Sequence, residues 1–120
     1  MKYLMLIYMA PGAFVGLSEE ERAGFMAEAD RHTEEIKASG ELVLGAALAD
    51  VENSKTVRVR KGVPATTDGP FAEAKEQLAG YYVLDCDGID RATEIAAKDP
   101  AARFWAVEVR PIMDEVGMEM

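Results

Sequence analysis

The sequence holds very few of the residues that build disulfides and metal centres. Its one cysteine is Cys86 and its one histidine is His32. A single cysteine excludes an intrachain disulfide and cysteine-based zinc or iron–sulfur cages, and a single histidine excludes three-histidine or HExxH metal sites within one chain. We therefore expect no metal and no other cofactor, and a reducing cytoplasm as the compartment.

Basic residues are also scarce. Lysine and arginine number 13 against 22 aspartates and glutamates, which gives a formal net charge of −9. An acidic surface repels phosphate backbones and anionic lipid headgroups. The charge thus argues against nucleic acid and against membrane surfaces as partners.

Long hydrophobic runs are missing as well. The first ten residues are apolar, yet they are too few to span a bilayer and lack the basic region and cleavage site of a signal peptide. A length of 120 residues, 49% of them hydrophobic, predicts one globular domain. We expect that domain over residues 1–112, followed by a tail at 113–120.

The clearest elements are an apolar strand and a long capped helix. Residues 2–9 are apolar on both faces, as in a central strand that is covered on both sides. Ser18 followed by Glu21 forms a capping box, and Gly40 supplies the stop of a helix that runs to about Ser39. Helical periodicity places His32 in the middle of the apolar stripe of this helix.

Turn and alternation signals divide the rest of the chain. Strands are predicted at 41–48 and 56–60 and should pair as a hairpin, with a short extended piece at 65–67 and another strand at 78–85. Asp87 should cap a second helix over 89–98, which Asp99-Pro100 ends, and 104–110 is the last strand.

This order predicts a ferredoxin-like α+β sandwich, βαββαβ with an extra hairpin, in which two helices cover one face of an antiparallel sheet. Two helices on one side cannot cover the second apolar face of the first strand. A second subunit packed sheet to sheet would cover it, so we expect a homodimer.

The stretch 67–82, TDGPFAEAKEQLAGYY, resembles the YCII-related family, in particular its DGPF branch. The apolar opening strand, Thr56-Val57-Arg58 and the closing Glu108-Val109-Arg110-Pro111 extend the resemblance over nearly the whole chain. Ala74 and Ala79 depart from the more usual Thr and Gly of the pattern. The resemblance implies a dimeric α+β barrel, and it implies no settled reaction.

His32 and Asp68 are the predicted catalytic residues. A lone histidine on an apolar helix face is a core residue in the simpler interpretation, and Asp68-Gly69-Pro70-Phe71 is a tight turn. In the functional interpretation His32 transfers protons near neutral pH and Asp68 orients its ring, as the suggested His–Asp site of the YCII branch also implies.

Three further residues are predicted to bind a substrate. Arg110 suits an anionic group, although an ion-pair network with Glu108 on the same strand face explains it equally well. Lys75 lies in a charged stretch that a solvated turn of helix also explains. Tyr81 and Tyr82 point to opposite faces of one strand, and Tyr82 is the one predicted to line a cleft.

These residues predict an enzyme that performs His/Asp acid–base chemistry on a small anionic or carbonyl-bearing molecule without a cofactor. The alternative is a dimeric module that binds a small ligand, or a regulatory partner, without catalysis.

Overall fold

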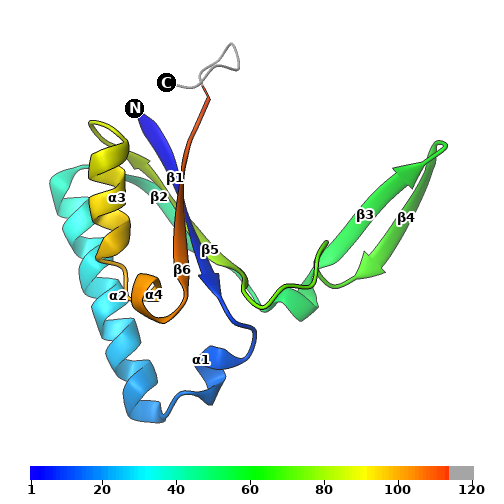
Figure 1. Ribbon diagram of the computed structural model, residues 1–120, viewed down its shortest axis with the longest axis horizontal. Coiled ribbons are helices and arrows are strands. Elements are labelled where there is room, and N and C mark those ends of the chain that lie inside the picture. Colours follow the sequence, from blue (N-terminus) through cyan, green and yellow to red (C-terminus); the bar gives the residue numbers. More distant parts are fainter. Residues whose placement is uncertain (114–120) are drawn as a thin grey trace.

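The computed structural model describes residues 1–113 and contains one four-stranded antiparallel sheet in the order β2-β5-β1-β6 (Figure 1). Two helices, α2 and α3, lie side by side on one face of this sheet, which is the predicted ferredoxin-like arrangement. The sheet strands are β1 (Lys2–Met9), β2 (Leu42–Ala47), β5 (Gln77–Asp85) and β6 (Ala106–Pro111).

The first strand is central because it is the most apolar segment of the chain. Tyr3, Met5 and Ile7 point toward the helices and belong to the buried core. Leu4 and Leu6 alternate with them and therefore face the opposite side, which no helix of the described residues covers. We call that side the helix-free face.

Helix α2 (Glu19–Ser39) has the predicted boundaries. The Ser18 hydroxyl accepts a hydrogen bond from the Glu21 backbone N–H at 3.0 Å, and the Glu21 carboxylate accepts from the Ser18 N–H at 2.9 Å. Gly40 ends the helix in the left-handed region at φ 79°, which a residue without Cβ adopts at little cost.

The second helical segment differs in detail from the prediction. Helix α3 (Ile89–Ala97) begins after Gly88 and no side chain within residues 1–113 caps it, so the prediction that Asp87 is the cap was wrong. Gly88 stands between Asp87 and the first turn. After Asp99-Pro100 the chain makes a short helix α4 (Ala101–Phe104), which takes Phe104 out of the predicted last strand.

The predicted hairpin between 41–48 and 56–60 was also wrong. Strand β2 pairs with β5, whereas β3 (Lys55–Arg60) pairs with β4 (Val63–Asp68) in a separate two-stranded sheet. The loop Lys61-Gly62 decides this pairing: both residues have positive φ, 52° and 76°, as a two-residue hairpin turn requires. Alternation along a strand identifies the strand without identifying its neighbour.

The remaining elements connect the sheet to this hairpin and to α2. A short helix α1 (Ala13–Gly16) follows β1, and a 3₁₀ turn η1 (Val51–Asn53) precedes β3. The two-stranded sheet extends away from the body of the domain (Figure 1).

Candidate functional site

A groove of about 920 Å³ lies between α2 and the β2–β5 half of the sheet, within the volume range of small-molecule sites. Its lining is mainly apolar and includes aromatic side chains. Among them are Phe14 of α1, Phe25 of α2 and Tyr82 of β5.

Two glycines of β2 and β5 leave space in the groove that a side chain would fill. A Cβ atom on Gly45 would lie 2.5 Å from Tyr82 Cδ1, and one on Gly80 would lie 3.0 Å from the Ala46 carbonyl oxygen. Any larger residue at these two positions would push into neighbouring strands or into the Tyr82 ring. Strand β2 has the sequence Leu-Val-Leu-Gly-Ala-Ala, and it pairs with β5. Its three small residues at 45–47 also leave open the space of the groove that larger side chains would fill.

The hydroxyl groups of Thr33 and Tyr82 form a hydrogen-bonded pair on the groove wall. Thr33 Oγ1 lies 3.0 Å from the Tyr82 hydroxyl and donates its own hydrogen to the Ala29 carbonyl oxygen, also at 3.0 Å. Because a hydroxyl has one hydrogen, Tyr82 must donate to Thr33, and the Tyr82 oxygen keeps free acceptor capacity. Tyr82 lies in the lining of the groove, and its substrate-binding role stays a prediction.

His32 and Asp99 make the most unusual contact in the site. Both side chains are almost wholly buried, and His32 Nδ1 lies 3.6 Å from Asp99 Oδ2. The second carboxylate oxygen, Oδ1, accepts from the Ala101 backbone N–H at 2.9 Å and so fixes the carboxylate at the start of α4. Asp99 is also the member of the pair that belongs to the lining of the groove.

Neither ring nitrogen of His32 has a hydrogen-bond partner among the described residues. Buried polar atoms are nearly always paired, since each unpaired one costs about 1–3 kcal/mol of folding free energy. The two His32 nitrogens are therefore an exception to this rule, and the groove-lining residue Asp99 is their acidic neighbour. The buried stripe of α2 holds His32 here, as its helical spacing predicts.

The structure does not bring His32 together with Asp68. Asp68 is exposed at the base of the β3–β4 hairpin, where it forms an ion pair with Lys55. The carboxylate beside His32 is Asp99 instead. Nothing in the sequence pointed to Asp99, because Asp99-Pro100 was interpreted only as a helix stop.

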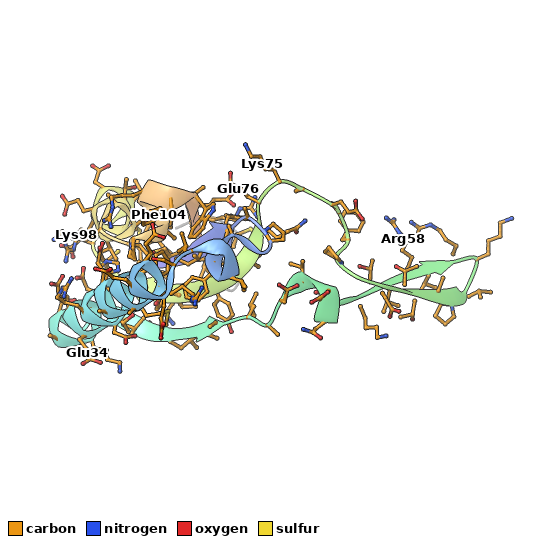
Figure 2. The ribbon with its side chains drawn as sticks, turned by 90° about the horizontal axis from the view of Figure 1, so that it is seen from below. Glu34, Arg58, Lys75, Glu76, Lys98 and Phe104 are labelled. Carbon is orange, nitrogen blue, oxygen red and sulfur yellow. The ribbon has the colours of Figure 1, made fainter. Side chains whose placement is uncertain are left out.

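Lys75 and Arg110 lie outside the groove. Figure 2 shows Lys75 on the loop between the hairpin and β5, pointing away from the body of the domain, and this loop is not helical. Arg110 shares a strand face with Glu108, with 3.8 Å between Nη2 and Oε2. That face is the helix-free one, because both residues pair with Leu4 and Leu6 of β1.

Glu108 also accepts a hydrogen bond from the Tyr8 hydroxyl at 2.9 Å. The carboxylate beside it raises the pKa of Tyr8, mainly through this hydrogen bond to the neutral phenol. The charged residues of β6 therefore interact with one another and with Tyr8, on the side of the sheet opposite to the groove.

Two findings concern membrane-spanning helices and metal-binding clusters within residues 1–113. No helix in this part of the chain has the length and apolar character to cross a membrane. In the same residues, no three His, Cys, Asp or Glu side chains are grouped to hold a metal ion. The C-terminal tail predicted at 113–120 lies, after residue 113, outside the described residues.

Comparisons with known proteins agree with the fold. The family model of the YCII-related domain matches residues 1–116. An uncharacterized protein, R00369, from Rhizobium meliloti (strain 1021) is 32% identical over 114 residues, which cover 93% of this chain and 92% of the relative.

A solved structure of similar fold is 5-chloro-2-hydroxyhydroquinone dehydrochlorinase, TftG, from Burkholderia phenoliruptrix AC1100, in complex with 2,5-dihydroxybenzoquinone. The TM-score is 0.56 with 15% sequence identity, over 99% of this chain and 100% of the other. A likeness at this identity concerns the fold alone.

Proposed function

Since the chain belongs to the YCII-related family, we propose that it is an enzyme that transfers protons to and from a small carbonyl- or hydroxyl-bearing molecule held in the groove. The observation that carries the proposal is the buried His32–Asp99 pair, in which Asp99 belongs to the groove lining and no described residue hydrogen-bonds the two ring nitrogens of His32.

The pair has the chemistry of a general base. It brings an imidazole and a carboxylate within 3.6 Å of each other, and both groups accept and return protons in enzymes. A proton leaves a C–H or O–H bond of the substrate, enters the pair at Asp99, and returns from it to the product. The bond electrons stay on the substrate as an enolate or phenolate.

The rest of the groove supports this assignment. Tyr82, whose oxygen keeps free acceptor capacity, is placed to bind a hydroxyl of the substrate. The aromatic and apolar walls formed by Phe14 and Phe25 favour a flat, weakly polar molecule. Tyr82 thus keeps the substrate-binding role predicted from the sequence, whereas Asp99 replaces Asp68 as the partner of His32.

The structure of TftG supports the substrate class. That protein is named for an activity on a chlorinated hydroxyhydroquinone, and its structure holds 2,5-dihydroxybenzoquinone, a flat molecule with carbonyl and hydroxyl groups. A molecule of this chemistry fits the volume and the lining of the present groove, so it is a suitable probe.

The test is the rate at which the ring C–H positions of 2,5-dihydroxybenzoquinone exchange with deuterium from solvent, measured by NMR. We expect the protein to accelerate exchange, and Asp99→Asn to lower the accelerated rate about 100-fold, a typical loss for a removed general base. His32→Gln should lower it as well and should shift its pH profile. The matched control is Asp87→Asn, the same change at an exposed position outside the groove.

Acceleration that survives in both His32→Gln and Asp99→Asn, with the variants folded, would refute the proposal. The second candidate is a binding module without catalysis. The apolar lining of the groove favours this candidate. It predicts that 2,5-dihydroxybenzoquinone binds and raises the unfolding temperature, while neither the wild-type protein nor any variant accelerates exchange.

A further inference from the structure

The groove beside α2 extends well past the hydroxyl pair of Thr33 and Tyr82. Phe25 also lines it and lies eight residues before Thr33 on α2, which is about 12 Å along the helix axis. On the sheet, Tyr82 pairs with Met5, and the groove-lining Met9 follows four residues later in β1, about 13 Å away. Helix and sheet therefore both indicate a length of about 12–13 Å from the Tyr82 level toward α1.

The polar groups of the groove gather on one side of this length. Thr33 and Tyr82 form their hydrogen-bonded pair there, and Lys37 follows Thr33 by one turn of α2. Asp99 contacts His32, the residue next to Thr33 in the helix, and it belongs to the same lining. We call this part of the groove the polar end.

The part toward α1 has a different lining, and we call it the apolar end. Asp30 marks the boundary on α2, because the groove-lining residues that precede it on this helix are apolar. Figure 1 shows α1 close to the first turns of α2, where it borders this end of the groove. The lining of the apolar end includes Met9, Phe14, Phe25, Met26, Ala47 and Leu48.

Two polar side chains border the apolar end, and each is engaged by its own loop. Asp50 Oδ1 accepts a hydrogen bond from the Glu52 backbone N–H at 3.0 Å. Gln77 Nε2 donates to the Ala72 carbonyl oxygen at 2.9 Å. These contacts fix the loops that border the groove and do not make the apolar end polar.

Apolar side chains at this end are in contact with water. Val15 of α1 is 76% exposed, Met26 of α2 is 47% exposed, and Leu48 after β2 is 43% exposed. All three line the groove. Exposed apolar side chains gathered at a concave surface mark a binding site, since a ligand that covers them removes apolar area from water. A single small ring at the polar end would leave them uncovered.

We propose that the groove binds a hydroxyquinone or phenol that carries an alkyl chain: the ring lies at the polar end beside Tyr82 and Asp99, and the chain extends into the apolar end. The inference rests on the proposed function, because the ring is the molecule from which the His32–Asp99 pair takes a proton. It adds that the substrate is amphipathic, with its polar and apolar halves in the order that the groove presents.

The test compares 2,5-dihydroxybenzoquinones that carry a methyl, propyl or hexyl group at ring position 3, with dissociation constants from isothermal titration calorimetry. We expect the hexyl compound to bind on the order of 100-fold more tightly than the methyl compound. Its five additional methylenes should each tighten binding about two- to fourfold, depending on how completely the apolar end covers them.

Variants of the apolar end separate this site from unspecific binding of the chain. Ala47→Leu fills part of the apolar end, and we expect the methyl-to-hexyl ratio of dissociation constants to fall to about 10 or less. Met26→Gln keeps the side-chain length at an exposed position, so the fold should persist, and it should lower the ratio about tenfold because the amide loses water to the chain. The matched control is Ala27→Leu, at an exposed α2 position that does not belong to the described groove lining, and it should keep the ratio.

Equal dissociation constants for the methyl and hexyl compounds in wild-type protein would overturn the inference. A ratio that persists in both folded variants would overturn it as well. Deuterium exchange at the remaining ring C–H of the same compounds distinguishes this inference from the proposed function. A gain in affinity from the hexyl group without acceleration of exchange would refute proton transfer and support the apolar end, whereas acceleration without that gain would refute the apolar end alone.

Discussion

Gly45 offers a sharp test of how the groove is built, because one methyl group should affect both stability and binding. A Cβ atom at this position would lie 2.5 Å from Tyr82 Cδ1 and 2.8 Å from Cε1. Carbon atoms pack at about 3.5–4.0 Å, so the Tyr82 ring must move by roughly 1 Å in Gly45→Ala. The hydrogen bond of that ring to Thr33, now 3.0 Å long, then breaks.

The magnitude follows from these displacements. Loss of the hydrogen bond costs about 1 kcal/mol and an off-rotamer tyrosine about 1 kcal/mol more, partly offset by a gain of about 0.5–1 kcal/mol from replacing glycine by alanine. The free energy of unfolding should therefore fall by about 1–1.5 kcal/mol, which lowers the midpoint temperature by roughly 4–6 °C. A ring that moves into the groove should also weaken binding of 2,5-dihydroxybenzoquinone.

The matched control is Gly24→Ala, the same substitution inside α2, where the added Cβ would meet no neighbouring element of the described chain within 4 Å. It should stabilise the protein by about 1 kcal/mol, since only the helix propensity changes. Urea denaturation followed by circular dichroism measures both. Equal effects of the two substitutions would refute the reasoning, as would a Gly45→Ala penalty that persists after Tyr82→Ala removes the ring.

Three further outcomes are expected. Ser18→Ala should lower the free energy of unfolding by about 1 kcal/mol in thermal melts, because it removes the capping box with Glu21; no loss would show that tertiary packing alone fixes this end of α2. The hydrogen bonds from Arg91 lower the pKa of Glu41 below its ordinary value of 4.5, so their stabilisation is present above that value and is lost as the pH falls through the lower folded pKa. Glu41→Gln should thus be less stable than wild type by up to about 1 kcal/mol at pH 7 and equal to it near pH 2, whereas a pH-independent difference in urea melts would contradict this. Burial raises the pKa of the Cys86 thiol, so Ellman's reagent should react slowly at pH 8 and fast in urea, and equal rates would place the thiol at the surface.

The boundaries of the long helix and of the apolar first strand follow from local chemistry. The Ser18–Glu21 capping box and Gly40 satisfy backbone groups within a few residues of themselves, so a sequence pattern can identify them. Strand pairing is different. The alternation in 56–60 predicts a strand, but its partner β4 was fixed by the positive φ angles of Lys61 and Gly62.

The candidate site shows the same difference between what local patterns predict and what they do not. Helical periodicity placed His32 in the buried stripe of α2. Alternation along β5 placed Tyr81 and Tyr82 on opposite faces of the sheet. Periodicity cannot say which carboxylate comes close to a buried ring. Asp99 is 67 residues away from His32 in the chain, and it arrives beside the ring because α3 ends there against the sheet.

The sequence by itself determined the fold class, the family and the presence of one histidine on a core-facing stripe, because these depend on spacing within single elements. Tertiary structure alone decided that the acidic partner is Asp99, that Asp68 pairs with Lys55 at the base of the β3–β4 hairpin, and that glycines leave a groove open beside Tyr82. Each of these depends on how elements distant in the chain pack, and packing is set by the summed contacts of many residues rather than by any local pattern.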